Sequence, residues 1–364
     1  MKKVLIVFNH PAPYKVRLFN ELAKDFDLSV IFERGKNKDR LTSFYSETNY
    51  KFNNIKIRGL KLGNENFISC GVKNHIKNNR YDLILMNGYS QFAEMKAIRY
   101  MQKHKIPYGL FINGGIIKHN ESQWRRKLKT SYISKASFFL SPDLKSNKYL
   151  TYYGANEKNI FNYPYSTIYE NEVLQKKPTT DQIESIKKEF GIQGKVVYVT
   201  AGQLIKRKNY QVLIESWKSM PQDNHLYIFG DGKEREHYRK IIKDLQVNNV
   251  HLCGFLEKEK LLKVFSVSDI FVFPSSEDIY GHVVNEALSQ GLPVISNTNV
   301  NSAIKLVSPS TGCLTSDFSA ANIIKLTKQI QDHCTFESCI NVARQNTIEK
   351  MVESISKTLS ENHK

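Results

Sequence analysis

Short apolar runs alternate with longer amphipathic stretches along the chain. Apolar side chains fill positions 4–8 and 28–32, and residues 14–24 between them carry apolar side chains at helical spacing. A strand, a helix and a strand at this spacing predict a βαβ unit. The alternation continues, which predicts a parallel sheet covered by helices on both faces. Further strands are expected at residues 82–86, 108–112, 137–140 and 160–163.

The pattern lapses near residues 163–180 and then begins again. Pro164, Pro178 and the polar run between residues 175 and 180 predict a linker. Later strands are expected at residues 196–200, 226–229, 250–252, 270–273 and 294–295, with helices at 210–217 and 234–245. The predicted fold class is therefore α/β, with two doubly wound Rossmann-like domains that face each other across a cleft.

The domain boundaries follow from this pattern. We expect an N-terminal domain at residues 1–168 and a C-terminal domain at residues 169–340. An apolar stripe from Ile348 to Leu359 predicts one long helix that begins near Ala343. We expect this last segment, residues 341–364, to cross back to the N-terminal domain.

Composition narrows the class of protein. The chain has 364 residues, of which 41% are hydrophobic and 24% charged, as in globular proteins with a large core. Five apolar residues before Asn9 are too few for a signal peptide, and no apolar run approaches a membrane span. The five cysteines show neither paired nor metal-type spacing. We therefore expect a cytoplasmic protein with reduced thiols.

The net charge of +18 is divided unevenly. Residues 1–168 hold 29 Lys or Arg against 12 Asp or Glu, whereas residues 169–364 hold 24 against 23. A basic half predicts an anionic partner, such as a membrane surface, a phosphorylated lipid or nucleic acid. A lysine-rich proteome is the alternative explanation of the total charge, and it accounts less well for the asymmetry.

Residues 122–140 predict an amphipathic basic helix. Trp124, Leu128, Tyr132 and Ile133 share one helical face, and five basic side chains surround it. Such a helix suits an anionic lipid surface. The alternative is an ordinary surface helix that packs Trp124 against the core. Together with the basic half, this helix favours a peripheral protein on the inner face of the cell membrane.

A basic turn follows the first strand of the second domain. Gly202 allows a close backbone turn. Lys208, with Arg207 beside it, lies where the next helix is expected to begin. Basic side chains at a helix N-terminus suit a diphosphate, and a solvated basic cap is the alternative.

The loop at Gly230 and Gly232 follows the next predicted strand. Arg235 occupies the position at which a dinucleotide-binding fingerprint needs its third glycine, so that fingerprint fails. The loop is either a tight structural turn or a loop that lines a nucleotide.

Two carboxylates accompany a third predicted strand-to-helix connection. Asp278 lies in the loop before the helix, and Glu286, eight residues later, lies on the helix. Unpaired N–H groups and the positive dipole at a helix N-terminus suit a phosphate. The two carboxylates are then placed to accept hydroxyl groups that the phosphate carries, such as those of a sugar.

Taken in order, these segments resemble the retaining, nucleotide-sugar-dependent glycosyltransferases of family 4, which have the GT-B architecture. Order and spacing match over about 100 residues of the chain. The matching segments are Ala201–Leu204 with Lys208, Gly230–Gly232, Gly254-Phe255, Ser268–Ser275, Glu286–Leu288 and Gly291–Ile295. The variant Glu277–Gly281 before Glu286 looks closest to members that build bacterial capsules and other surface polysaccharides. In the first domain, residues 10–17 and the Asn113–Gly115 turn resemble the family more weakly.

The resemblance implies a role for each site residue. Asp278 would hold hydroxyl groups of the donor sugar, Glu286 the ribose of the nucleotide, and Lys208 the diphosphate. Gly281, His282 and Val283 would offer backbone N–H groups. The donor-binding set that the resemblance implies is Gly202, Gln203, Arg207, Lys208, Gly230, Gly281, His282, Val283 and Glu286.

One position departs from the family pattern. Gln203 stands where the family usually has Arg, which removes one phosphate-binding cation. Arg207 is a possible substitute, but its adjacent position is expected to point it elsewhere on a helix. The departure leaves the identity of the donor, UDP- or GDP-linked, more open.

His10 is a candidate acceptor-side catalytic residue because it follows the first strand, and His119 competes for this role. A structural, hydrogen-bonding histidine is the alternative reading of His10. The resemblance implies front-face attack on the donor with neither a metal nor another cofactor. Asp25-Phe26-Asp27 is the only D-x-D string, and its position predicts a turn rather than a metal site.

The sequence thus predicts a retaining glycosyltransferase, hexosyl- or related, in surface polysaccharide biosynthesis. It would move a sugar from a nucleotide-sugar donor to a lipid-linked or oligosaccharide acceptor. A nucleotide-sugar 2-epimerase of the same architecture is one alternative, and a transferase-like protein that has lost activity is another. A basic module that binds nucleic acid or membrane without catalysis is the third, but the basic residues lie scattered over helices and loops, which disfavours nucleic acid.

Overall fold

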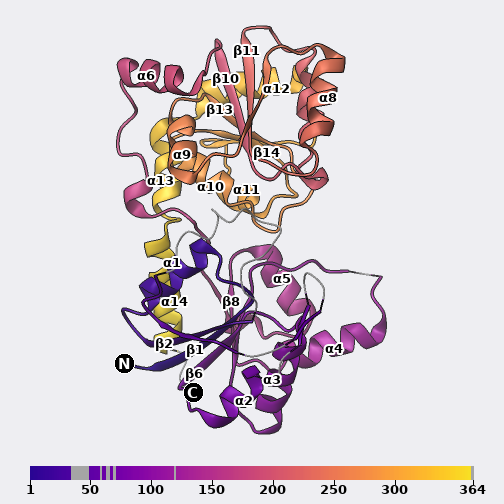
Figure 1. Cartoon of the computed structure of the whole chain (residues 1–364), viewed down its shortest axis with the longest axis vertical. Helices are drawn as coiled ribbons and strands as arrows, with labels where there is room; N and C mark the ends of the chain where they lie inside the picture. Colours follow the sequence, from indigo (N-terminus) through magenta and orange to yellow (C-terminus); the bar gives the residue numbers. More distant parts are fainter. Residues whose placement is uncertain (34–48, 58–59, 63–65, 69–70, 119, 362–364) are drawn as a thin grey trace. The chain divides into compact units, whose positions relative to one another are not determined.

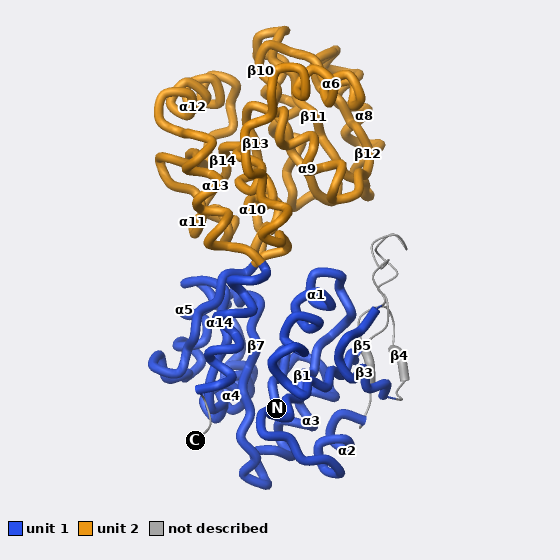
Figure 2. The backbone as a smooth tube through the Cα atoms, turned by 90° about the vertical axis from the view of Figure 1, so that its left-hand side faces the viewer, with its two compact units in different colours: residues 1–165, 348–364 blue, residues 166–347 orange. Residues whose placement is uncertain are grey.

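The computed structural model describes residues 1–33, 49–57, 60–62, 66–68, 71–118 and 120–361. The chain divides into two compact units (Figure 2). Unit 1 contains residues 1–165 and 348–364, and unit 2 contains residues 166–347. Each unit is built on its own parallel sheet (Figure 1).

Unit 1 has a seven-stranded sheet in the order β3-β2-β1-β6-β7-β8-β9, in which every neighbouring pair is parallel. The strands are β1 (Lys3–Phe8), β2 (Asp27–Phe32), β3 (Asn53–Ile55), β6 (Leu83–Met86), β7 (Gly109–Phe111), β8 (Phe138–Ser141) and β9 (Ile160–Asn162). The helices are α1 (Pro13–Leu22), α2 (Gly71–Asn78), α3 (Phe92–Lys103), α4 (Gln123–Ile133), α5 (Leu144–Tyr152) and α14 (Ile348–Glu361). A separate antiparallel pair joins β4 (Leu60–Leu62) to β5 (Asn66–Ile68).

Side chains of β1 reach both faces of this sheet, as the period of two along a strand requires. Leu5 and Val7 belong to the apolar cluster that contains buried residues of α2 and α3. Phe8 packs edge-on against Phe19 of α1, with ring centroids 5.5 Å apart. The continuous apolar run of β1 is therefore that of a strand buried on both faces.

Unit 2 has a six-stranded parallel sheet in the order β12-β11-β10-β13-β14-β15. The strands are β10 (Val196–Ala201), β11 (Asn224–Phe229), β12 (Val250–Gly254), β13 (Ile270–Phe273), β14 (Val294–Ser296) and β15 (Gly312–Leu314). The helices are α6 (Thr180–Phe190), α7 (Tyr210–Trp217), α8 (Arg235–Leu245), α9 (Lys258–Ser266), α10 (Val283–Leu288), α11 (Asn301–Leu306), α12 (Ala320–His333) and α13 (Phe336–Arg344).

The strand order of unit 2 reverses between β10 and β13. Chain order runs outward through β11 and β12 on one side of β10, and through β14 and β15 beyond β13 on the other. Ligands of such sheets bind beyond the carboxyl ends of the strands at this reversal. A ligand site is therefore expected at the connections that leave β10 at Ala201 and β13 at Phe273.

The predicted α/β fold class with two parallel sheets is confirmed. Strands predicted at residues 4–8, 196–200 and 270–273 appear within one residue of their observed bounds. The predicted cleft between the domains stays a prediction.

No described helix is long and apolar enough to cross a membrane. Among the described residues, no group of three or more His, Cys, Asp or Glu is placed to hold a metal ion.

The predicted single helix from Ala343 to Leu359 is wrong, because the chain leaves helical geometry between α13 and α14. Asn346 lies in this break, and its carbonyl accepts a hydrogen bond from Asn285 Nδ2 at 2.7 Å. The unit boundaries lie between residues 165 and 166 and between residues 347 and 348. The sequence predicted them between residues 168 and 169 and between residues 340 and 341. Helix α14 lies in unit 1, where Ser356 Oγ donates to Asp25 at 2.7 Å.

A pair of stacked histidines at the edge of the unit 2 sheet makes stability depend on pH. His225 of β11 and His251 of β12 have ring nitrogens 3.0 Å apart. Burial lowers the pKa of both rings, and the charge of His225 lowers that of His251 further. The unfolded chain therefore binds more protons near pH 6.5, so unit 2 loses stability as the pH falls through about 6.5.

We expect the melting temperature to fall from pH 7.5 to 5.5, and to fall less in the double variant His225→Asn, His251→Asn. The fall should be small, because both rings are part-exposed and solvent screens their charges. Thermal unfolding at the two pH values measures the difference. His237→Asn, an exposed histidine on α8, is the control, and an equal fall in the double variant and the wild type would contradict the assignment.

Candidate functional site

Three glycines bring the carboxyl ends of β10, β11 and β12 into direct backbone contact. Gly202 N donates to Phe229 O at 2.9 Å, and Gly230 N donates to Gly254 O at 2.7 Å. A Cβ atom on Gly230 would lie 1.9 Å from the carbonyl oxygen of Gly202, and the φ of Gly230 is 138°. Only glycine fits there. The basic turn that contains Lys208 lies beside this backbone contact.

Lys208 is a buried lysine at the end of that turn. It belongs to the 3-10 turn η4 (Lys206–Lys208), and it is 8% exposed. Its ammonium group pairs with the carboxylate of Asp278 and lies 4.5 Å from the centre of the Phe273 ring. Burial lowers the pKa of Lys208, and the nearby Asp278 charge opposes that change. The pair joins the loop after β10 to the loop after β13.

Arg207 reaches the same carboxylate, and the expectation that it points elsewhere is wrong. Its guanidinium donates to Glu277 O at 2.9 Å and lies 3.4 Å from Asp278 Oδ2. The reason is the backbone: a 3-10 turn precedes Asn209, whose left-handed φ of 56° separates it from α7. Gln203 is exposed in the same connection.

The loop that carries Asp278 is held by hydrogen bonds to α11 and to the segment before it. Asp278 N donates to Asn299 O at 3.1 Å, and Ser302 Oγ donates to Gly281 O at 2.7 Å. Gly281 has a φ of 87°, and a Cβ atom there would lie 2.8 Å from Val300 Cγ1. His282 is the N-cap residue of α10, so the amides of residues 281–283 stand at the start of that helix.

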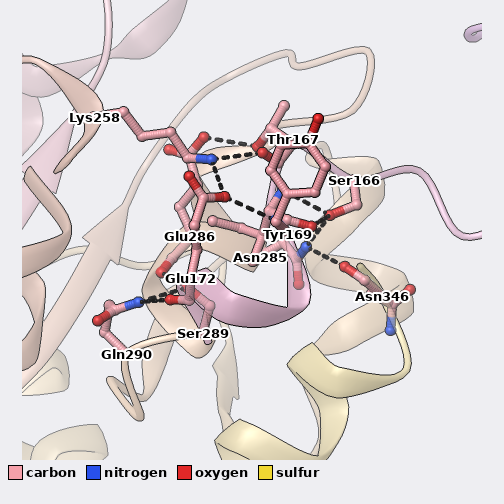
Figure 3. A network of polar contacts seen from close by, with 11 residues as sticks. Ser166, Thr167, Tyr169, Glu172, Lys258, Asn285, Glu286, Ser289, Gln290 and Asn346 are labelled. Carbon is pink, nitrogen blue, oxygen red and sulfur yellow. Dashed lines mark hydrogen bonds and ion pairs between the residues drawn. The ribbon is translucent and has the colours of Figure 1, made fainter. Parts of the chain in front are cut away.

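Glu286 lies on α10 within a network of polar side chains (Figure 3). Thr167 Oγ1 donates to Glu286 Oε1 at 2.8 Å. Burial raises the pKa of Glu286, while the charge of Lys258 and then the Thr167 hydrogen bond act to lower it. Lys208 and Glu286 also perturb each other electrostatically. Lys208 and Asp278 are thus in direct contact, and Glu286 is near enough for its charge to act on Lys208. The predicted roles of the three residues stay predictions.

The predicted acceptor-side histidine lies in the other unit of the chain. His10 belongs to unit 1, where it follows β1 and its amide donates to Asn9 Oδ1 at 2.8 Å. His119 lies outside the described residues. The catalytic role predicted for His10 stays a prediction.

Sequence reasoning missed a buried lysine in unit 1. Lys15 is 0% exposed, and its ammonium group lies 4.4 Å from the centre of the Phe111 ring and 4.5 Å from that of Tyr165. It donates to Asn113 Oδ1 at 2.9 Å, and burial holds its pKa well below the usual range. The signal was present, since Lys15 stands four residues before Phe19 on the apolar stripe of α1. It fixes the Asn113 turn to α1.

Helix α4 presents its tryptophan to solvent. Trp124 is 62% exposed, whereas Leu128 and Tyr132 of the same helix pack against the core of unit 1. The guanidinium of Arg125 lies 5.4 Å from the centre of the Trp124 ring. The alternative in which Trp124 packs against the core is therefore wrong.

Part of the second unit matches a known protein family. Residues 182–337 match the family described as glycosyl transferases group 1. The lipopolysaccharide core biosynthesis glycosyltransferase LpsE of Rhizobium meliloti is 33% identical over 101 residues, which are 28% of this chain and 29% of LpsE. An uncharacterized 41.2 kDa protein in the cps region of Klebsiella pneumoniae is 22% identical over 68% of each chain.

Solved structures resemble the whole chain. Anabaena Alr3699/HepE in complex with UDP superposes with a TM-score of 0.77 at 18% identity, covering 98% of this chain and 99% of that one. WaaG, a glycosyltransferase involved in lipopolysaccharide biosynthesis, gives a TM-score of 0.68 at 15% identity, covering 98% and 100%. These similarities show the fold and, with the family match, support a transferase. The predicted resemblance to glycosyltransferases of GT-B type is confirmed.

The backbone contact at the site predicts a contrast between two glycine substitutions. Gly230→Ala should lower the melting temperature at least twice as far as Gly191→Ala. Both positions have positive φ, but a Cβ on Gly191 meets nothing within 4 Å, so alanine there costs only the left-handed strain of about 1–2 kcal/mol. Thermal unfolding of both variants measures the two shifts in melting temperature. Equal shifts would mean that the backbone at Gly202 and Gly230 moves apart with no loss of stability.

Proposed function

Because residues 182–337 form a glycosyl transferases group 1 domain, we propose that this chain is a retaining glycosyltransferase of surface polysaccharide biosynthesis. It takes a sugar from a nucleotide-diphosphate donor and transfers it to a lipid-linked or oligosaccharide acceptor. The observation that carries the proposal is the convergence of Lys208 and Arg207 on Asp278 where the strand order of unit 2 reverses. The relatives named for lipopolysaccharide core biosynthesis and for a cps region support the polysaccharide context.

The donor site follows from the placement of these groups. Lys208 and Arg207 bind the diphosphate, and Asp278 accepts hydroxyl groups of the sugar. Glu286 accepts the ribose hydroxyl groups, and the amides of residues 281–283 complete the donor contacts. The UDP complex of the Anabaena protein supports a UDP-linked donor. Because Gly202 and Gly230 lack side chains, the ends of β10 and β11 meet closely beside this site.

The chemistry depends on charge placed in advance. Breaking the bond between sugar and diphosphate leaves negative charge on the diphosphate and positive charge on the ring. The ammonium group of Lys208 stabilises the negative charge on the diphosphate, and the carboxylate of Asp278 lies beside the positive charge on the sugar ring. Because the Lys208–Asp278 pair is largely withdrawn from water, its charges act at greater strength than they would in solution.

Unit 1 supplies the acceptor side in this proposal. The exposed Trp124 of α4 and its exposed neighbours Arg125, Arg126 and Lys127 form a surface suited to anionic lipid. A lipid-linked acceptor would be reached from that surface. The protein would then be peripheral on the cytoplasmic face of the membrane.

Substitution of the site tests the proposed activity. We expect Lys208→Ala and Glu286→Ala each to lower kcat/KM for transfer at least about 100-fold, because each removes a group that stabilises the bound donor or its leaving diphosphate. Sugars linked to UDP or GDP are first screened by thermal stabilisation, since a ligand of the native state raises its melting temperature. Release of the nucleoside diphosphate with an acceptor extract then measures transfer.

Lys206→Ala is the matched control, since Lys206 is exposed in the same turn. Circular dichroism checks that each variant is folded. Turnover like that of the wild type in either site variant would refute the assignment. An altered sugar formed from the donor alone would favour the 2-epimerase.

A second substitution set tests the membrane surface. The triple variant Trp124→Ala, Arg125→Glu, Arg126→Glu should lower the partition onto anionic vesicles more than about 10-fold, since each basic residue near such a surface contributes about 1 kcal/mol. Co-sedimentation with vesicles that contain phosphatidylglycerol as the anionic lipid measures it. The control variant Phe255→Ala, Lys240→Glu, Lys243→Glu makes the same charge change at exposed positions of unit 2. Unchanged sedimentation of the first variant would exclude this surface.

A further inference from the structure

Glu286 is anchored through one of its two carboxylate oxygens. Thr167 Oγ1 donates to Oε1 at 2.8 Å (Figure 3). Within the described part of the chain, this is the one side-chain hydrogen bond that the carboxylate receives. Oε2 is thereby left to accept a hydrogen bond from a ligand, while Oε1 fixes the orientation of the group.

Thr167 is held against α10 by the residues next to it. Asn285, the neighbour of Glu286 on α10, donates to Ser166 Oγ at 3.0 Å and to Asn346 O at 2.7 Å. Two successive residues of α10 therefore contact two successive residues of the segment that opens unit 2. Thr167 is only 9% exposed, so its side chain is fixed rather than solvated.

Lys258 fixes the backbone of the same threonine. It is the first residue of α9, and its ammonium group donates to Thr167 O at 2.6 Å and to Glu172 Oε2 at 2.6 Å. Glu172 in turn accepts from Tyr169 N at 2.7 Å. Lys258 therefore acts on Glu286 in two ways, through the position of Thr167 and through its own positive charge.

The charged groups around Glu286 shift its pKa in opposite directions. Burial raises its pKa most; the Lys258 charge and the Thr167 hydrogen bond lower it, Glu172 raises it, and Lys208 lowers it. These groups come from α9, the opening segment of unit 2, the 3-10 turn η3 (Glu170–Glu172) and the turn after β10. Lys258 is the largest influence that keeps Glu286 ionised.

We propose that Thr167 and Lys258 are positioning residues, which hold the Glu286 carboxylate turned so that its second oxygen accepts a ribose hydroxyl of the donor nucleotide. This inference rests on the proposed function, in which Glu286 binds the ribose. Neither residue belongs to the motifs that carry the resemblance. A site built to accept a hydroxyl discriminates against a ligand that lacks it, because its own polar atom is then left unpaired.

The first experiment measures that discrimination. Calorimetry gives Kd for UDP and for 2′,3′-dideoxy-UDP at pH 8 with the full chain. We expect the wild type to prefer UDP by at least about 10-fold, the equivalent of 1.4 kcal/mol. Thr167→Val and Lys258→Met should lower that preference below about threefold, whereas Thr167→Ser and Lys258→Arg should keep it. Lys260→Met, at an exposed lysine of the same helix, is the matched control.

The second experiment measures Kd for UDP between pH 5 and 8. Binding that needs an ionised Glu286 weakens as the pH falls through the pKa of that group. Removing the charge of Lys258 raises this pKa further, so in Lys258→Met the weakening begins at a higher pH. Lys258→Arg should restore the wild-type profile, which a purely structural loss would not predict.

Preference ratios and pH profiles of Thr167→Val and Lys258→Met that equal those of Lys260→Met and the wild type would overturn the inference. That failure is distinct from failure of the proposed function. If the wild type binds no UDP, or if Glu286→Ala keeps the full preference for UDP, the assigned role of Glu286 is wrong and the inference falls with it. If Glu286→Ala alone loses the preference, only the positioning roles are wrong.

Discussion

A buried ammonium group needs an opposite charge, and this need organises the site of unit 2. Lys208 is 8% exposed and stands beside the Phe273 ring, so its desolvation must be offset by Asp278. Removing either partner would leave the other charge buried and alone, which is far more costly than the pair itself. The ion pair therefore holds two connections, one after β10 and one after β13, at the reversal of the sheet order.

The backbone around the pair lets it form. The contact between Gly202 and Gly230 brings the ends of β10 and β11 together, and the bridge from Asp278 to Val300 holds the other connection. These backbone contacts restrict both connections. The conformational entropy needed to bring Lys208 and Asp278 together is therefore lost on folding and need not be lost again on ligand binding. Backbone contacts within unit 2 thus hold the charged pair in place, and the proposed electrostatic stabilisation of a leaving group needs charges held in this way.

Much of the fold could be predicted from the sequence, because the apolar runs of β1, β10 and β13 are short, continuous and well separated. The family resemblance also grouped Lys208 with Asp278, and the structure shows these two side chains in contact. The break between α13 and α14 was not predictable, since residues 345–347 contain neither glycine nor proline. Its partner is Asn285, which lies 61 residues away in sequence from Asn346.

The direction of Arg207 and the network around Glu286 escaped prediction for a similar reason. No glycine or proline marks the left-handed Asn209 that separates the basic turn from α7. Thr167 and Glu286 are 119 residues apart, and Lys258 and Thr167 are 91 apart, so local periodicity carries no trace of their contacts. What sequence reasoning lacks here is the tertiary partner, and such long-range polar contacts decide how a predicted carboxylate is oriented.

The position of Arg207 bears on the one departure from the family pattern. Gln203 supplies no charge, and Lys208 is already paired with Asp278. Arg207 has five donor N–H groups, uses one on Glu277 O, and keeps 45% of its side chain exposed. Its remaining donors can bind two oxygens of a diphosphate at once, which a lysine does not do. In the proposed donor site, Arg207 therefore supplies the cation that position 203 lacks, through a side chain that the 3-10 turn directs toward Asp278.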